Sequence, residues 1–290
     1  MKIRKAVIPA AGLGTRVLPA TKACPKEMLS IVDKPAIQYI VEEAAASGIT
    51  DILIITSRGK SVVEDHFDRS TELEEHLMRT GKEEMAEEIR RISRLANIQY
   101  VRQPERKGLG HAIWCAKAFV GNEPFAVLYG DDVIISPTLP ACKELCDAYL
   151  QYGLGTVGMK PVPKEHISRY GSLKVSPLQD RLYRVTDMIE KPAPGQEFSN
   201  YTIQGRCVLP PEIFDILENL PADRKGEIQL TDAMRKLAVG PGMIGVEYLG
   251  TRYDMGNKLG ILQASVEVGL QHPEIGPELR QYLKNLAQNL

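Results

Sequence analysis

The chain has 290 residues, 43% of them hydrophobic and 25% charged, a composition typical of an ordinary soluble globular protein that argues against a disordered or fibrous one. Its 36 lysines and arginines nearly balance 37 acidic residues, and the formal net charge of -1 provides no overall field for nucleic acid or an anionic membrane. We therefore expect neither as a partner. Any anion must be met by local charge, and residues 1–26 hold six lysines or arginines and no acid.

The five cysteines are sparse and lack paired C-x-x-C spacing, which argues against a disulfide or zinc framework. This usage is typical of a reducing compartment, and we expect a cytoplasmic protein. The basic start of the chain is similar to a secretory signal, but Pro9, Gly12 and Arg16 cut the apolar run short. No later stretch approaches the length of a membrane span, so we expect neither export nor a membrane anchor.

Short apolar runs with turn residues nearby predict buried strands in the first half of the chain, at residues 5–10, 51–56, 98–103 and 125–130. Helical patterns lie between them. One begins at Pro35, places apolar residues on a single face and stops at Gly48, and residues 112–119 repeat its spacing. Strands that alternate with helices imply a mainly parallel sheet covered on both faces, at least as far as about residue 150. Ligands of such sheets bind beyond the carboxyl ends of the strands.

The second half of the chain is less regular. Strand-like segments lie at residues 156–162, 172–176, 183–192 and 243–249, and helical patterns lie at 211–220 and from Lys258 towards the C-terminus. These patterns predict an extension of the sheet followed by a helical end. The charged segment 71–96 has the pattern of an exposed helix, or of a helical hairpin broken at Gly81, and we assign it no chemistry. No repeat or long linker divides the chain, so we expect one cooperative unit.

The stretch AGLGTRVLPATKACPKEM, residues 11–28, directly follows the first predicted strand. Gly12 and Gly14 would let backbone N–H groups approach an anion closely. A dinucleotide fingerprint fails, because a third glycine is missing and no acid follows the second predicted strand. A P-loop fails because neither G-K-S nor G-K-T is present. What remains is a glycine-containing backbone with three cations, Arg16, Lys22 and Lys26. That set suits a row of phosphates, and these residues alone leave an ordinary basic surface loop equally open.

A longer series of motifs decides between these alternatives. IPAAGLGTRVLPATKACPKEML and VDKPAIQYIVEEAAASGI are followed in order by VRQPERKGLGHA, GDD, YG, IEKP, GEIQLTDA and YDMGNKLG. This series spans nearly the whole chain and closely resembles the sugar-1-phosphate nucleotidylyltransferases, above all the bacterial UTP:glucose-1-phosphate uridylyltransferases. The resemblance implies their α/β fold, a Rossmann-like three-layer αβα arrangement with a mixed, mainly parallel central sheet. It also implies one domain, residues 1–290, with a nucleotide-binding part at 1–150, a sugar-phosphate-binding part at 151–256 and a C-terminal helical part at 257–290.

The resemblance implies a reaction as well. An oxygen of the sugar phosphate attacks the α-phosphorus of UTP in line, pyrophosphate leaves, and no covalent enzyme intermediate forms. Such catalysis needs positioning and charge neutralisation. The family pattern supplies three catalytic cations: Arg16 beside the triphosphate, Lys26 near the reacting phosphates and Lys191 at the phosphate of the sugar.

Two acids are implied as ligands of one Mg²⁺. Asp131 follows the strand-like FAVLYG, Asp254 lies in RYDMGN, and Asp132 is an alternative ligand. Oxygen ligands suit magnesium, which can also bridge phosphates. Without the resemblance, an aspartate after a strand is more often a turn or helix cap.

The resemblance also assigns the substrates UTP and glucose 1-phosphate to particular residues. It implies nucleotide-binding roles for Ala11, Gly12, Gly14, Glu27, Gln103 and Gly108. Gln103 and Gly108 would read uracil, and Glu27 matches the uridylyl group where thymidylyl relatives commonly carry Gln. The implied sugar-phosphate-binding residues are Gly171, Glu190 and Lys191, because a bare backbone, a hydroxyl acceptor and a cation suit that ligand.

The sequence departs from the family pattern near the sugar motifs, at Tyr129, Ser172, Tyr201, Thr202, Gln204 and Cys207. Another sugar or a thymidylyl donor therefore stays an alternative, as does a non-catalytic regulatory paralogue. The paralogue is disfavoured because the cations and acids are present, and a nicotinamide-dependent oxidoreductase is disfavoured by the broken fingerprint.

The five histidines show no metal-ligand spacing, and only His111 lies near the predicted site. The family commonly forms dimers or tetramers, so we expect a homodimer or homotetramer.

Overall fold

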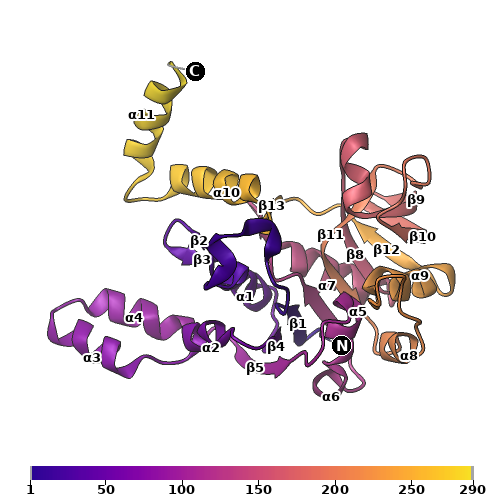
Figure 1. Ribbon diagram of the computed structural model, residues 1–290, viewed down its shortest axis with the longest axis horizontal. Coiled ribbons are helices and arrows are strands. Elements are labelled where there is room, and N and C mark those ends of the chain that lie inside the picture. The colour runs from indigo at the N-terminus through magenta and orange to yellow at the C-terminus, as the bar shows by residue number, and fades with distance from the viewer. Residues whose placement is uncertain (1, 289–290) are drawn as a thin grey trace.

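Nine strands within the described residues, 2–288, form one central sheet in this computed structural model (Figure 1). Their order is β5-β4-β1-β6-β11-β8-β12-β10-β9. The strands of this sheet are β1 Lys5–Pro9, β4 Asp51–Thr56, β5 Asn97–Arg102, β6 Phe125–Leu128, β8 Thr156–Pro161, β9 Gly171–Gln179, β10 Leu182–Glu190, β11 Tyr201–Leu209 and β12 Met243–Val246. Two short ribbons stand apart from the sheet, β2 Ser30–Ile31 with β3 Lys34–Pro35, and β7 Asp132–Ile135 with β13 Thr251–Asp254.

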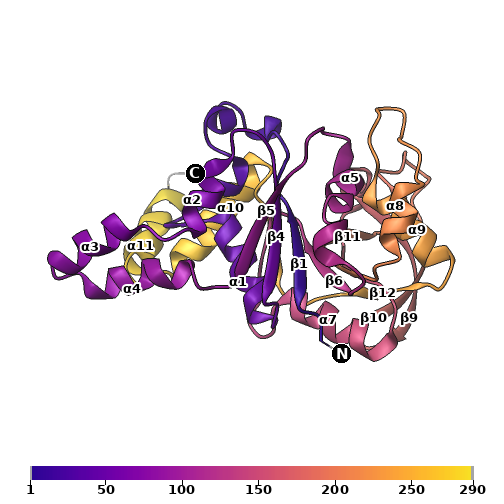
Figure 2. The ribbon, with the colours of Figure 1, turned by 90° about the horizontal axis from the view of Figure 1, so that it is seen from below.

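Helices connect the strands and lie on both sides of the sheet (Figure 2). The α-helices are α1 Ala36–Ala46, α2 Ser61–Phe67, α3 Thr71–Arg79, α4 Glu83–Ile92, α5 Gly108–Trp114, α6 Lys117–Val120, α7 Ala141–Tyr152, α8 Ile213–Glu218, α9 Leu230–Val239, α10 Lys258–Gln271 and α11 Gly276–Ala287. Short 3-10 helices lie at Thr15–Val17, Ala20–Lys22, Lys26–Met28 and Lys164–Arg169. No helix within residues 2–288 is long and apolar enough to cross a bilayer.

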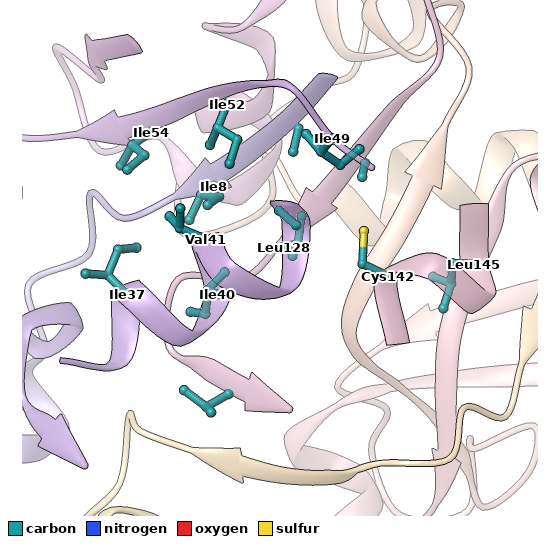
Figure 3. Close-up of a cluster of buried hydrophobic side chains, with 14 of the residues drawn as sticks. Ile8, Ile37, Ile40, Val41, Ile49, Ile52, Ile54, Leu128, Cys142 and Leu145 are labelled. Carbon is teal, nitrogen blue, oxygen red and sulfur yellow. The ribbon is translucent and has the colours of Figure 1, made fainter. Parts of the chain in front are cut away.

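The sheet carries a separate apolar core on each face. Ala6 and Ile8 of β1 belong to one core together with Ile40 of α1 (Figure 3). Val7, which lies between them, belongs to the other core together with Ile113 of α5. Successive side chains of a strand point to opposite faces, so both faces of β1 are buried. The predicted three-layer αβα architecture is confirmed.

The strands expected in the first half are present as β1, β4, β5 and β6, and they pair in parallel. Helix α1 starts after Pro35 and ends before Gly48, whose φ of 88° is left-handed. The helix expected at 112–119 is instead divided into α5 and α6. Its backbone tightens at the break, where the N–H of Ala116 donates to the carbonyl of Ile113, three residues back.

In the second half, the expected strand segments correspond to β8, β9, β10 and β12. Strand β11 is an addition that the sequence analysis did not predict, and it pairs antiparallel with both β6 and β8. It thereby joins residues 1–150 to residues 151–256 in one mixed sheet. The functional division into three parts stays a prediction, and residues 1, 289 and 290 of the outer parts lie outside the described chain.

Two helical pairs extend from the body. The charged segment forms the predicted hairpin, α3 and α4, which is broken at Gly81 with a φ of 72°. Helix α11 follows α10 and leads to the C-terminal end, away from the sheet (Figure 1).

Candidate active site

A pocket of about 700 Å³ opens where β1 and β6 reach their carboxyl ends, as expected for parallel strands. Its lining comes from both halves of the chain, from Pro9 at the end of β1 to Asp254 at the end of β13. Every residue predicted for the site lines this pocket except Gly14 and Glu27. The fold therefore brings together residues that the sequence separates by more than two hundred positions.

The loop after β1 presents its backbone and two cations to the pocket. Ala11, Gly12, Arg16 and Lys26 all line it. A Cβ on Gly12 would lie 3.7 Å from Lys26 Nζ, so the bare glycine keeps the space beside this ammonium open. Gly14 has a φ of 69°, and a Cβ there would press on Thr21 at 3.1 Å. Its contribution is the turn itself, not contact with the pocket.

Asp131 and Asp254 lie around one guanidinium. Arg16 Nη2 is 3.6 Å from Asp131 Oδ2, and Arg16 Nη1 is 3.6 Å from Asp254 Oδ2. Lys26 Nζ donates to the same oxygen of Asp131 at 2.5 Å. A Cβ on Gly256 would lie 2.8 Å from Asp254 Oδ1 and 2.9 Å from Asp131 Oδ2. The guanidinium of Arg16 approaches the same point even more closely, so only glycine lets this cation and both carboxylates converge on the backbone here.

The charges of this cluster are coupled. Burial alone would raise the pKa of Asp131, but Lys26, and more weakly Arg16, hold that pKa below its ordinary value. Burial likewise opposes the charge of Lys26, yet Asp131 and Glu27 raise the pKa of this ammonium. The neighbouring Asp132 is different, because burial raises its pKa and its carboxylate is already paired with Arg252 at 2.6 Å. Asp131 and Asp254 are thus the acids that face the pocket as a pair.

The residues predicted to read the base lie in the pocket just after β5, an edge strand of the sheet. Gln103 and Gly108 line the pocket, and the side-chain amide of Gln103 donates to the carbonyl of Gly108 at 3.1 Å. Gly108 has a φ of 88°, and a Cβ there would lie 2.7 Å from the carbonyl oxygen of Ile228. The close approach of the 227–228 segment therefore requires glycine at this position.

Glu27 differs from the prediction, since its carboxyl is fully buried and does not line the pocket. Lys60, which precedes α2, donates to Glu27 Oε2 at 2.8 Å and also to the carbonyl of Ala10. Burial raises the pKa of Glu27 and lowers the pKa of Lys60, so each partner depends on the other to stay charged. The pair fixes the backbone just before Ala11. Lys60 was not predicted from the sequence, although its place after the carboxyl end of β4 was a usable signal.

The residues predicted to bind the sugar phosphate come from β9 and the end of β10, at the opposite edge of the sheet from β5. Gly171 has no room for a side chain, since a Cβ would lie 2.7 Å from Ile203 Cδ1 and 3.3 Å from Glu190 Oε2. Glu190 accepts a hydrogen bond from the hydroxyl of Thr231 at 2.7 Å. Lys191 Nζ lies 3.2 Å from the other carboxyl oxygen of Glu190, and its side chain is well exposed. The backbone of Lys191 has a φ of 43°, an uncommon conformation for a non-glycine residue.

Several lining residues were not predicted from the sequence, among them Arg106, Arg169, Tyr170, Thr231 and Arg252. Arg252 pairs with Asp132 and lies over the ring of Tyr170, 5.3 Å from its centroid. It stands two residues before Asp254 on β13, and residues with this spacing share a strand face. Its spacing from Asp254 could have marked Arg252 as a candidate residue of the site.

Most departures from the family pattern lie outside the pocket. Tyr201, Thr202, Gln204 and Cys207 all belong to β11, and none of the four lines the pocket of the described chain, whereas Ile203 does. Tyr201 instead shares hydrogen bonds with Tyr183 and Glu247. Lys22 also stands outside the pocket lining and is exposed.

The chain matches known proteins over nearly its full length. The model of the nucleotidyl transferase family matches residues 5–269. The UTP–glucose-1-phosphate uridylyltransferase YngB of Bacillus subtilis (strain 168) is 53% identical, over 99% of this chain and 96% of its own length. A UTP-bound UGPase from Acinetobacter baumannii has a TM-score of 0.91 at 38% identity and covers 98% of this chain and 99% of its own. A UDP-glucose pyrophosphorylase complexed with UDP-glucose has a TM-score of 0.84 at 42% identity, with coverages of 93% and 100%.

Proposed function

The chain belongs to the nucleotidyl transferase family, and we propose that it transfers the uridylyl group of UTP to glucose 1-phosphate, which yields UDP-glucose and pyrophosphate. The enzyme is a UTP–glucose-1-phosphate uridylyltransferase. One feature of the structure is the main support for the proposed reaction. The cations Arg16 and Lys26 and the acids Asp131 and Asp254 meet in a single pocket, which is also lined by the residues predicted for the base and for the sugar. A reaction between two phosphates needs that juxtaposition.

The chemistry of the chain's own residues is positioning and charge neutralisation. Arg16 presents two guanidinium nitrogens and can brace the phosphoryl group under attack, whereas Lys26 contributes a compact charge beside it. Lys191 holds the phosphate of the sugar, so that its oxygen faces the α-phosphorus in line. No side chain needs to act as a nucleophile, because the two substrates react directly.

The site fits a divalent cation, and we assign Mg²⁺ to Asp131 and Asp254. The two carboxylates converge, since Asp254 Oδ1 and Asp131 Oδ2 both lie within 2.9 Å of one point beside Gly256, which the guanidinium of Arg16 also approaches. No group of three or more His, Cys, Asp or Glu side chains suited to a metal exists within residues 2–288. Two carboxylates with water and substrate phosphates suit magnesium. Bound there, the ion would neutralise phosphate charge.

The backbone of Ala11 and Gly12 lies under the nucleotide in this proposal, and Gln103 and Gly108 contact the uracil. Gly14 shapes the loop, and Glu27 acts at a distance by holding Lys60 against the carbonyl of Ala10. On the sugar side, the Gly171 backbone approaches the ring closely. Glu190, fixed by Thr231, accepts hydrogen bonds from sugar hydroxyls.

We also propose a homodimer or homotetramer and a cytoplasmic location. The cysteines support the second proposal, because all five are free thiols in the structure, as expected in a reducing compartment. Light scattering during size-exclusion chromatography would give the number of subunits.

A pyrophosphate-release assay tests the proposed reaction most directly. Four nucleoside triphosphates are each paired with several sugar 1-phosphates in the presence of Mg²⁺. We expect UTP with glucose 1-phosphate to have the highest kcat/KM. Preference for dTTP or for another sugar would favour the corresponding relative, and UTP binding without turnover of any pair would favour a regulatory paralogue.

A further inference from the structure

The side-chain amide of Gln103 is held by two partners on the same atom. Gln103 follows β5, and its backbone N–H donates to the carbonyl of Thr56 at 2.9 Å. Its side-chain Nε2 lies 3.1 Å from the carbonyl oxygen of Gly108 and 3.0 Å from Nδ1 of His111 on α5. The residue is only 7% exposed, and its exposed part lines the pocket.

These partners fix which way the amide points. A carbonyl oxygen can only accept, so the Gln103 atom that faces Gly108 must be the nitrogen. The second amide proton is then directed to His111 Nδ1, which must carry a lone pair. Both donors are used, and Oε1 accepts no hydrogen bond from any residue within the described chain. The polar atom that Gln103 offers to a ligand is therefore an acceptor.

The surroundings of His111 favour the neutral ring that this arrangement requires. Burial and the nearby Lys107 lower the pKa of His111, and Glu105 opposes them only weakly. Trp114 stacks on the ring, with centroids 6.0 Å apart and planes at 20°. The imidazole is thus held in place from one side while its Nδ1 faces the amide.

We propose that His111 is a positioning residue for base choice, an inference that rests on the uridylyltransferase function proposed above. By fixing the amide of Gln103 with its oxygen toward the base, His111 selects a pyrimidine whose N3 carries a proton. Uracil donates from N3, whereas cytosine presents a lone pair there and meets the oxygen with repulsion. Thymine has the same hydrogen-bonding edge as uracil. The arrangement therefore discriminates UTP from CTP and does not discriminate UTP from dTTP.

Two variants of His111 test the proposal. His111→Phe keeps a ring against Trp114 and removes the acceptor, whereas His111→Asn keeps an acceptor near the position of Nδ1. The measurement is kcat/KM for UTP, CTP and dTTP with glucose 1-phosphate. We expect His111→Phe to lower the UTP/CTP ratio about tenfold, the scale of one hydrogen bond, and to leave the UTP/dTTP ratio within about twofold. His111→Asn should recover most of the UTP/CTP ratio.

The UTP/CTP and UTP/dTTP ratios together distinguish a role of His111 in positioning the Gln103 amide from a merely structural role. If UTP/CTP and UTP/dTTP fall together in His111→Phe, or if UTP/CTP stays at the wild-type value, the proposal is wrong. Calorimetry measures the UTP/CTP ratio of binding affinities without turnover, and we expect the same variants to change that ratio in the same direction. An inactive wild type would thus count against the proposed reaction, while the binding ratio would still decide the role of His111. If His111→Phe does not fold, the UTP/CTP ratio of His111→Asn decides, since a tenfold fall in that variant would overturn the proposal.

Discussion

Nearby cations offset the repulsion between the carboxylates of Asp131 and Asp254. Two half-buried carboxylates at such close quarters repel each other, and here Arg16 spans them while Lys26 pairs with one. A triphosphate in the pocket would compete for both cations with its own oxygens. The carboxylates then need another positive charge, which is the physical reason to expect a divalent cation in the substrate complex.

Asp131→Asn and Asp254→Asn should each lower kcat at least about a hundredfold, the scale of losing a charge-stabilising group at a reaction centre. The measurement is pyrophosphate release at saturating Mg²⁺. Asp187→Asn is the matched control, because Asp187 pairs with Arg235 outside the pocket lining, and its rate should stay within about twofold of the wild type. Wild-type rates in either site variant would remove Asp131 or Asp254 from the metal site.

The residues that sequence analysis could find are those inside recognisable motifs, such as Gln103 and Asp254. Lys60 and Arg252 escaped it for a physical reason. Their roles come from partners distant in the chain, Glu27 at 33 residues and Asp132 at 120 residues. Only the folded sheet brings such pairs together, so the place of each residue beside a strand end or a motif can mark it as a candidate but cannot identify its partner.

At the scale of elements, the α3–α4 hairpin is more than an exposed charged face. Glu74 on α3 is only 2% exposed at its side chain, and it accepts hydrogen bonds from Arg69 and from Arg90 of α4. Those two guanidinium groups hold the pKa of Glu74 at about 2. The ion pairs therefore join the two helices of the hairpin to each other.

The folded pKa of Glu74 lies below the unfolded value of about 4.3. Its contribution to stability is therefore present above about pH 4.3 and is lost as the pH falls towards 2. We expect Glu74→Gln to lower the melting temperature at pH 7. Between pH 5 and pH 2, the melting temperature of this variant should fall less steeply than that of the wild type. Circular dichroism melts over this range check the prediction. Glu84→Gln, at an exposed position of α4, should keep the wild-type curve, and a wild-type curve for Glu74→Gln would count against the ion-pair role.

Strand β11 shows why one element of the sheet was missed. Thr202, Gln204 and Arg206 interrupt the continuous apolar run that served as the sign of a buried strand, yet all three are buried. Their polarity is satisfied inside the protein: Gln204 donates to the hydroxyl of Thr202, and Arg206 pairs with Glu43. Strands with continuous apolar runs, such as β1 and β4, followed the simple apolar rule and were predicted correctly.

At the scale of the whole molecule, one buried ion pair connects the centre of the sheet to its helical layer. Arg206 of β11 is 1% exposed and donates to both carboxyl oxygens of Glu43 on α1, 163 residues earlier in the chain, at 3.0 and 2.6 Å. Glu43 also accepts from the backbone N–H of Cys142 at the start of α7, at 2.9 Å. Arg206 further donates to the carbonyl of Asp132, beside the acids of the pocket. Residues 1–150 and residues 151–256 are therefore expected to unfold together.

Arg206→Met should lower the free energy of unfolding by about 3–5 kcal/mol, because it leaves the carboxylate of Glu43 buried without a partner charge. The double variant Arg206→Met, Glu43→Gln should recover much of this loss, since the neutral amide can still accept from Cys142. Urea denaturation, with a single transition in the wild type, measures both. Arg235→Met breaks a surface pair and should cost no more than about 1 kcal/mol. If Arg206→Met lowers the free energy of unfolding no more than Arg235→Met does, or if the wild type unfolds in two separate transitions, the ion pair does not couple the two parts.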